Sequence, residues 1–351
     1  MWRFLIACGL VLMGVQACEA APRETPVALT IDTSQADQAL KILSEEAAGR
    51  TPSNEDWREL FATIPYQWLK ARESSLGRAL TDDDFKRFLA SPEALAKRAD
   101  WSQTLERMKV ADMVAIGRSV LAWLPAGATI RAQVFPLIKP AANSFVWTEP
   151  KGGGPAIFLY VKPMSQAQFE NTVAHETHHI GLNSLADQQQ TRLVDQPERV
   201  RRAVEWMGAF GEGEAMLAAA GSVERHPHWE DDAASRARWD GDLMHFNTDV
   251  AQIAQLLSDI LDGRLNTDEQ IRQRAAPFWG EAQGAWYTVG YEMAALVERR
   301  FGRAALNEAL LDPRELLVRY NQVAAEADAK GATLATWPAQ LLARLGVGAT
   351  N

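Results

Sequence analysis

The segment Val173-Ala174-His175-Glu176-Thr177-His178-His179-Ile180 carries the deciding pattern of this chain. It contains the motif H-E-x-x-H, in which two histidines stand four residues apart. Just upstream, Ser165 is followed three residues later by Gln168, which is the signature of a capping box at a helix start. Apolar residues then recur at helical spacing. The segment is therefore predicted to be a helix that presents both imidazoles on one face.

Two imidazoles on adjacent helical turns can bind one ion and leave a coordination position open for water or a substrate carbonyl. His175 and His179 are thus predicted to be ligands of a single Zn²⁺ ion. Glu176 is predicted to be the general base that takes a proton from water and later delivers it to the leaving amine. His178 points about 100° away from its neighbour and is predicted to face solvent or a supporting carboxylate. The alternative is a solvated polar helix face that binds no metal.

A catalytic zinc site needs a third protein ligand. The metzincin continuation would place Gly at position 182 and His or Asp at 185, but the chain has Leu182 and Leu185 there, so that group is excluded. A glutamate from a second helix is the remaining common solution, and Glu198, Glu212 and Glu214 compete for the role.

Glu212 is the preferred third ligand. Glu198 begins a basic helix, where the helix dipole alone explains an acidic residue. Gly213 and Ala215 would let the helix of Glu212 approach the metal-bearing helix closely. Glu214 is the substitute if the helix phase differs, and an acidic pair at a helix start without any metal role is the competing interpretation.

H-E-x-x-H followed by Glu212-Gly213-Glu214-Ala215 resembles the gluzincin group of zinc metallopeptidases. Further segments resemble a family of bacterial envelope proteins known as zinc-dependent peptidases, namely Trp57, Tyr66, Arg72-Glu73, Tyr287-Thr288-Val289-Gly290-Tyr291, Phe301-Gly302-Arg303 and Asp312-Pro313-Arg314. The resemblance implies a gluzincin fold with His175, His179 and Glu212 as zinc ligands, Glu176 as the base and a peptidase-like activity. It does not specify a substrate.

A group that stabilises the developing oxyanion is also required. The candidates are Tyr287, Tyr291, His226, His228 and His245. Tyr287 is preferred because a phenol donates a hydrogen bond without needing a charge and because it lies in a segment that the resemblance marks. The alternative is that both tyrosines pack in the core. The loop from His226 to His228 is predicted to be a surface turn.

The pattern outside the motif predicts an α+β fold that is predominantly helical. Residues 25–125 are expected to form a helical region, with helix caps at Ser34, Ser53 and Thr81. Strands are expected near residues 130–134, 145–147 and 156–161. Residues 126–345 would then form a zincin-like catalytic region, whose small sheet packs beside the active-site helix. The strand at 156–161 is a candidate to pair with an extended peptide, and a plain core strand is the competing interpretation.

Residues 1–20 have the pattern of a secretory signal, because Arg3 precedes a twelve-residue apolar run that is too short to span a bilayer. The run ends in Val15-Gln16-Ala17-Cys18, which resembles a bacterial lipobox with cleavage before Cys18. Membrane attachment through a lipidated Cys18 and ordinary cleavage after Ala20 are the two alternatives. The protein is expected in the periplasm or as an outer-membrane lipoprotein.

Composition narrows the function classes further. The chain has 351 residues and a net charge of -9, with no cluster of Lys and Arg, which argues against a nucleic-acid partner. Two cysteines are too few for a disulfide framework. The sequence identifies no partner protein. It predicts a zinc-dependent metallopeptidase of the cell envelope that acts on a peptide or protein substrate, and the alternative is a non-catalytic zinc-binding or scaffold lipoprotein.

Overall fold

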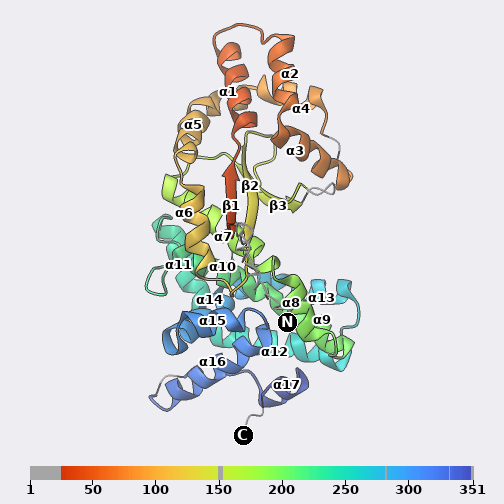
Figure 1. The fold of residues 1–351 in the computed structure, drawn as a ribbon, viewed down its shortest axis with the longest axis vertical. Coiled ribbons are helices and arrows are strands. Elements are labelled where there is room, and N and C mark those ends of the chain that lie inside the picture. Colours follow the sequence, from red (N-terminus) through yellow and green to blue (C-terminus); the bar gives the residue numbers. More distant parts are fainter. Residues whose placement is uncertain (1–24, 79, 149–152, 281–282, 332, 349–351) are drawn as a thin grey trace, which may run out of the picture.

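The computed structural model describes residues 25–78, 80–148, 153–280, 283–331 and 333–348 (Figure 1). The signal segment and Cys18 lie outside these residues. The molecule is elongated, with the N-terminal helices at one end, the C-terminal helices at the other and the sheet and the helix Gln166–Asn183 (α7) between them (Figure 1). Among the described helices, none is long and apolar enough to cross a bilayer.

A four-stranded sheet has the order β1-β2-β4-β3. The strands are Val27–Ile31 (β1), Ile130–Leu137 (β2), Phe145–Thr148 (β3) and Pro155–Tyr160 (β4). β1, β2 and β4 run parallel, and β3 pairs antiparallel with β4. The three strands expected from the sequence are confirmed. β1 was not expected, because it lies in the segment predicted to be helical and pairs with β2 across about a hundred residues of chain, with Val27 opposite Ile130.

The two faces of the sheet pack in different cores, because successive side chains along a strand point to opposite faces. Val134 and Ile157 point to the face covered by the helices Ser34–Ala47 (α1), Met113–Leu121 (α6) and α7. Phe135 and Phe158 point to the other face, where they pack with Leu69. Both faces of the central strands are buried, which explains why β4 is continuously apolar.

Helices make up most of the rest of the chain. Those before the sheet are Ser34–Ala47 (α1), Asn54–Ala62 (α2), Ile64–Ser75 (α3), Asp82–Leu89 (α4), Pro92–Lys109 (α5) and Met113–Leu121 (α6). The middle of the chain forms Gln166–Asn183 (α7), Ala186–Leu193 (α8), Glu198–Met207 (α9), Gly208–Phe210 (η1) and Gly211–Ala220 (α10). The last part forms Ala233–Leu243 (α11), Phe246–Asp262 (α12), Asp268–Ala275 (α13), Ala276–Trp279 (η2), Ala285–Phe301 (α14), Arg303–Ala309 (α15), Pro313–Asp328 (α16) and Ala339–Arg344 (α17). The predicted class, α+β with helix predominant and a small sheet, is confirmed.

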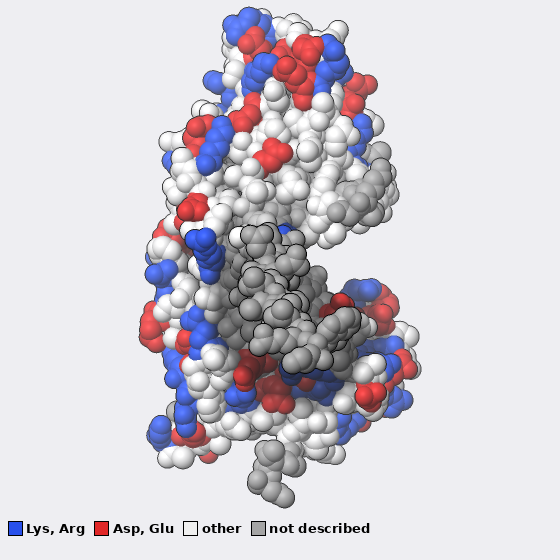
Figure 2. Space-filling model, viewed as in Figure 1, with Lys and Arg blue, Asp and Glu red and all other residues white. Residues whose placement is uncertain are grey.

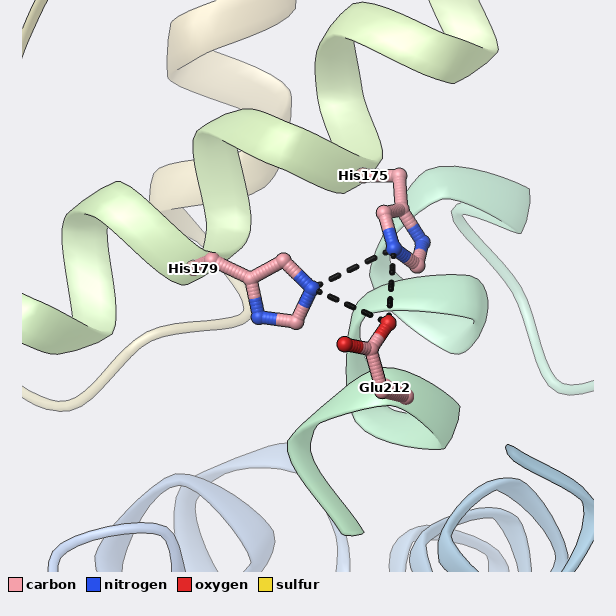
Figure 3. Close-up of side chains that lie close together, drawn as sticks. All are labelled: His175, His179 and Glu212. Atoms are coloured by element: carbon pink, nitrogen blue, oxygen red, sulfur yellow. Dashed lines mark hydrogen bonds and ion pairs between the residues drawn. The ribbon is translucent and has the colours of Figure 1, made fainter. Parts of the chain in front are cut away.

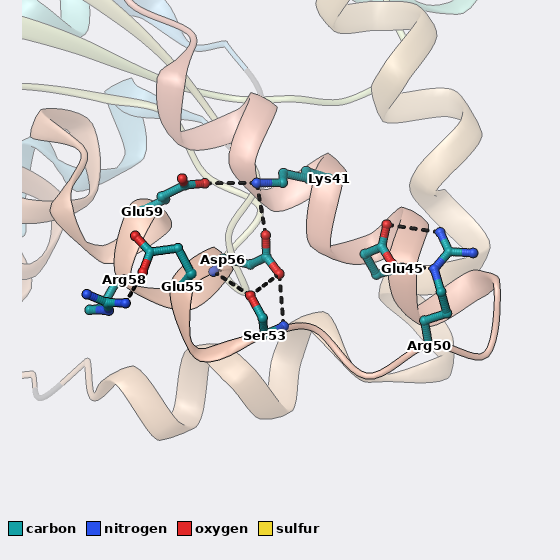
Figure 4. Close-up of polar contacts among 8 residues, drawn as sticks. All are labelled: Lys41, Glu45, Arg50, Ser53, Glu55, Asp56, Arg58 and Glu59. Atoms are coloured by element: carbon teal, nitrogen blue, oxygen red, sulfur yellow. Dashed lines mark hydrogen bonds and ion pairs between the residues drawn. The ribbon is translucent and has the colours of Figure 1, made fainter.

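Local capping chemistry sets several helix starts. Ser53 accepts a hydrogen bond from the backbone of Asp56, whose carboxylate accepts one from the backbone N–H of Ser53 (Figure 4). Lys41 on α1 pairs with Asp56 and Glu59 at 2.9 and 2.8 Å, which ties α1 to α2 (Figure 4). The cap at Thr81 is also confirmed, because its hydroxyl accepts a hydrogen bond from the backbone N–H of Asp84.

Two main cores lie on either side of α7. One draws its buried residues from positions 27–185 and includes the helix-facing side of the sheet. The other draws on Trp123 and positions 200–345. On the face drawn in Figure 2, positive and negative side chains are interspersed over both halves. α7 and α10 contact one another between the two cores, and this contact is where the motif residues lie.

Candidate metal centre

The segment that carries the H-E-x-x-H motif is the helix α7, as the sequence predicts. Ser165 is its N-cap and forms the expected capping box with Gln168. Phe169 and Val173 are fully buried and hold one face of the helix against the N-terminal core. His175 and His179 project from the opposite side one turn apart, half-buried, toward α10 (Figure 3).

Three ligand atoms converge at this point. The two Nε2 atoms of His175 and His179 lie 3.2 Å apart. Glu212 Oε2 lies 3.2 Å from the first and 3.4 Å from the second (Figure 3). Among the described residues, these three form the one group of His, Cys, Asp or Glu side chains with the spacing of a metal site.

The triangle fits a zinc ion. Tetrahedral zinc with bonds of about 2.0–2.1 Å separates its ligand atoms by about 3.3–3.4 Å, which follows from the tetrahedral angle. The three observed edges, 3.2, 3.2 and 3.4 Å, are close to that value. Two imidazoles and one carboxylate are also a common ligand set of catalytic zinc, and three protein ligands leave a fourth position open.

Glu212 lies in the first turn of α10, as expected. The glycine beside it, however, allows a close approach to a helix other than α7. A Cβ on Gly213 would lie 2.1 Å from the backbone nitrogen of Tyr291 and 2.2 Å from the carbonyl oxygen of Tyr287. Gly213 therefore lets α10 pack against α14, so the prediction that it serves the approach to the metal-bearing helix is wrong. A Cβ on Gly290 of α14 would likewise lie too close to the backbone of Phe210.

The electrostatics of the triad favour an ionised carboxylate. Burial acts to raise the pKa of Glu212, but hydrogen bonds from His175 and His179 and their charge hold that pKa far below its usual range. Burial likewise acts to lower the pKa of His179, and the Glu212 carboxylate overcomes this and raises it. A carboxylate that stays ionised beside two imidazoles is suited to bind a divalent cation.

The other two candidates for the third ligand lie away from the triangle. Glu198 is the exposed first residue of α9 and pairs with Arg202 at 3.3 Å. Glu214 is buried in α10, and burial raises its pKa to about 7, with the charge of His179 opposing. The structure therefore brings Glu212, and neither Glu198 nor Glu214, to the two histidines.

Glu176 and His179 line a hollow of about 430 Å³ between α7 and the sheet. Val146 and Thr148 of β3 line the same hollow. β3 is an edge strand of the described sheet, whereas β4 lies between β2 and β3. Both edges of β4 are thus already paired, which supports the core-strand interpretation of residues 156–161 over the peptide-pairing one.

Tyr287 and Tyr291 have different surroundings although they share α14. The ring of Tyr287 stacks near His175, with centroids 6.5 Å apart and planes 11° apart. Burial and the neighbouring Glu212 carboxylate raise the pKa of its phenol, so it stays protonated. Tyr291 is 7% exposed, donates to the carbonyl of Arg225 and packs on Trp239, which is a core role.

His228 lies closer to the site than the sequence suggested. It lines a hollow of about 240 Å³ together with His175 and Tyr287. Its Nδ1 lies 2.7 Å from Asp231 Oδ2 and its Nε2 lies 2.8 Å from Gln283 Oε1. The loop from His226 is therefore folded onto the metal centre, and the sequence signal was the acidic residue three positions after His228.

His178 does not face solvent or a carboxylate. It is 1% exposed, and burial together with the nearby His179 and His175 lowers its pKa to about 3. His178 is therefore a neutral, buried imidazole, because other parts of the chain cover this side of α7 as well. The expectation for this residue was wrong because helical phase alone does not say which neighbours cover each face.

One comparison with known proteins identifies a family. Residues 57–329 match one family model, which carries the description "Putative zinc dependent peptidase (DUF5700)". No curated protein and no solved structure matches the chain. The matched range includes α7, α10 and α14, the three helices that supply the residues described above.

Proposed function

The chain belongs to the family described as "Putative zinc dependent peptidase (DUF5700)", and we therefore propose that it is a zinc metallopeptidase that hydrolyses peptide bonds with Glu176 as its general base. The observation that carries the proposal is the triangle of ligand atoms from His175, His179 and Glu212, whose edges of 3.2–3.4 Å match a tetrahedral zinc ion. These three residues would hold one Zn²⁺.

Each residue then has a distinct task. A zinc ion held by the triad supplies Lewis acidity for the substrate carbonyl and the attacking water. The Glu176 carboxylate accepts the proton of that water as it attacks, and then gives the proton to the amine that leaves. Glu176 lies in the hollow beside His179, where a substrate would enter.

Two side chains beside His175 are candidates to act on the carbonyl oxygen as it gains negative charge. The Tyr287 phenol stays protonated and lies beside His175. His228 shares its hollow, with its ring held by Asp231. We assign the donation to Tyr287, because its phenol stays protonated, and an orienting role to His228, whose ring is held by Asp231 and Gln283.

The substrate backbone is proposed to bind along the edge strand β3. An extended peptide can add to the edge of a sheet by main-chain hydrogen bonds. Val146 and Thr148 of β3 line the hollow that holds Glu176 and His179. The sequence-based proposal that a peptide lies between the sheet and the His175 helix is thus kept, with β3 in place of β4.

The proposed location is the cell envelope, and its support is the pattern of residues 1–20. Export would follow from the apolar run after Arg3, and lipidation of Cys18 would attach the protein to a membrane. Labelling of cells with radioactive palmitate tests the second step. A Cys18→Ala variant that still carries label contradicts lipidation at this residue.

The decisive experiment is the substitution Glu176→Gln. Removal of the base should lower kcat on a cleaved peptide by about 10²–10⁴-fold, the usual contribution of a general base. Zinc content, measured by mass spectrometry of the purified protein, should stay near one ion per chain, because Glu176 is outside the ligand triangle.

Three outcomes would contradict the proposal. Retained turnover in Glu176→Gln would reject the assigned base. A zinc-to-chain ratio near zero in the gently purified parent protein would leave a helical protein without a metal role. A full complement of zinc with no cleavage of any peptide in a diverse library would favour the non-catalytic zinc-binding alternative.

A further inference from the structure

Hollows adjoin the metal centre from two sides. The hollow of about 240 Å³ is lined by His175, Tyr287 and Asn171. The hollow of about 430 Å³ is lined by Glu176, His179 and Asn183. The two share no lining residue. A chain bound at the triad therefore has room on both sides of it.

Each of these hollows shares one lining residue with a further hollow. Asn171 also lines a hollow of about 400 Å³ between α6 and α7, and Asn183 also lines one of about 440 Å³ beside α8 and α9. In the space-filling view, the surface is indented between the upper and lower halves at the level of α7 (Figure 2). Along α7, this row of hollows therefore extends past the metal centre in both directions, to Asn171 and to Asn183.

The length of this row can be estimated from α7. Asn171, His175, His179 and Asn183 follow one another every four residues along the helix. Twelve residues of helix rise by about 18 Å. An extended peptide rises about 3.3 Å per residue, so five to six substrate residues match this length.

Asn171 has an atom that a substrate could satisfy. Its Oδ1 is buried and accepts no hydrogen bond from the described residues. Buried polar atoms are normally paired, and the residue that carries this one lines two of the hollows. A main-chain N–H of a passing peptide would supply the missing donor.

An enzyme that trims chain ends needs a charged group to hold the free end. In the hollow of His175, the Asp231 carboxylate already accepts from His228 at 2.7 Å and from Gln168 at 3.0 Å, so it is not offered to a free amine. In the other hollow, Glu176 has the task of the base. Arg131 lines that hollow and is the residue that would hold a free carboxylate, so the experiment must test this alternative.

We propose that the substrate is an internal stretch of an extended polypeptide, about six residues or longer, bound on both sides of the metal centre, which makes the protein an endopeptidase. This rests on the peptidase function proposed above. One water is consumed and one C–N bond breaks. The acyl carbon gains the hydroxyl, the amine gains the proton carried by Glu176, and both products are peptides.

The test compares one pool of mixed-sequence decapeptides in four forms: with free ends, N-acetylated, C-amidated and blocked at both ends. The zinc-loaded full chain is expected to cut all four at rates within about threefold of one another. Mass spectrometry at early times should show paired fragments of three or more residues. Shortening the peptide to four residues should lower kcat/KM at least tenfold, because contacts on remote residues are lost.

Dependence on a free end would overturn the proposal. A fall of more than tenfold on amidation would assign the free carboxylate to a group such as Arg131, and the same fall on acetylation would assign a free amine. Release of single residues as first products would do so as well. If none of the four pools and no denatured protein is cut while zinc is bound, the peptidase function itself fails.

Variants of the two asparagines test the row directly. Asn171→Ala and Asn183→Ala should each raise KM for the decapeptides about three- to tenfold, with kcat little changed. The effect of each should vanish on tetrapeptides that do not reach the substituted residue. Gln166→Ala is the matched control, since this exposed first residue of α7 lines none of these hollows. Unchanged KM in both asparagine variants, with native circular dichroism, contradicts the two-sided binding mode.

Discussion

The sequence offers three glutamates as the third zinc ligand, and the structure distinguishes them by their surroundings. Glu212 is the one whose carboxylate lies within 3.4 Å of both imidazoles. Glu198 is exposed at the start of α9. Glu212→Gln should weaken zinc binding about 100-fold or more, since even residues that only support a ligand contribute 10–100-fold.

Glu198→Gln is the matched control, because it removes the same charge from the same protein. Its zinc affinity should equal that of the parent. Zinc binding can be followed by competition with a chromogenic chelator. If both variants bind zinc as the parent does, Glu212 is not a ligand.

Lys139 gives a prediction about pH. Its side chain is 2% exposed at the end of β2 and donates to Asn143 Oδ1 at 2.6 Å. Burial lowers its pKa to about 8, with the charges of Arg72 and Arg78 adding to the effect and that of Glu73 opposing it. Between pH 8 and the ordinary lysine value of about 10.5, the unfolded chain holds a proton that the native protein has lost, so stability rises with pH.

The variant Lys139→Met isolates this contribution. The variant lacks this titration, so its free energy of unfolding minus that of the parent should fall by about 2 kcal/mol from pH 8 to 10.5, allowing for partial solvation of the amine. Urea unfolding at several pH values measures it. A difference that stays constant or grows over this range contradicts the assignment.

Among the helices, the crossing of α10 and α14 positions the third ligand. A methyl group at Gly213 would lie 2.1–2.2 Å from the backbone of α14, so a side chain there would push the helices apart. Gly213→Ala should destabilise the protein by about 1–3 kcal/mol, as overpacking does. It should also weaken zinc binding, because the neighbouring Glu212 moves with α10.

Gly208→Ala provides the control. A methyl group at Gly208 would meet no atom within 4 Å, and the residue has helical φ and ψ of -54° and -21°. The substitution should leave zinc binding unchanged and stabilise the protein by up to about 1 kcal/mol. Thermal unfolding and zinc titration of the two variants make the comparison. Equal effects would show that the α10–α14 crossing does not position the ligand.

Helix starts were predictable where a side chain reaches its own backbone. The capping boxes at Ser53 and Ser165 form as expected, because the two residues of each box stand three positions apart in the chain. The cap predicted at Ser34 is wrong by one residue: Thr33 is the N-cap, and its hydroxyl donates to Asp37 at 2.7 Å. β1 was missed because its partner, β2, lies about a hundred residues later, and strand pairing has no local signature.

Across the molecule, the two cores meet through specific contacts. The amide of Asn307 on α15 donates to the carbonyls of Ala122 and Leu124, at 3.2 and 2.8 Å. Arg303 lies over the ring of Trp123, 2.9 Å from its centroid. α7 packs in the N-terminal core and α10 largely in the C-terminal one, so a bound zinc ion would join the two cores.

Removal of zinc should therefore loosen the whole molecule. A ligand present at about a thousand times its dissociation constant stabilises the native state by about 4 kcal/mol. Chelation with 1,10-phenanthroline should lower the melting temperature by at least about 5 °C, given 2–4 °C per kcal/mol for a large domain. Differential scanning calorimetry measures the shift. His179→Ala is the control and should show no shift with the chelator, whereas an unshifted parent would exclude a structural role for the metal.

Local spacing along the chain was enough to predict the helical class, the motif helix with its cap, and the pair of histidines one turn apart, because these features depend on residues three or four positions from one another. The folded arrangement was needed to show which glutamate meets the histidines, which strand has a free edge, and that His228 and Asn171 lie beside the site. Those outcomes depend on how α7, α10, α14 and the sheet pack against one another. Such contacts join residues far apart in the chain, where periodicity carries no information.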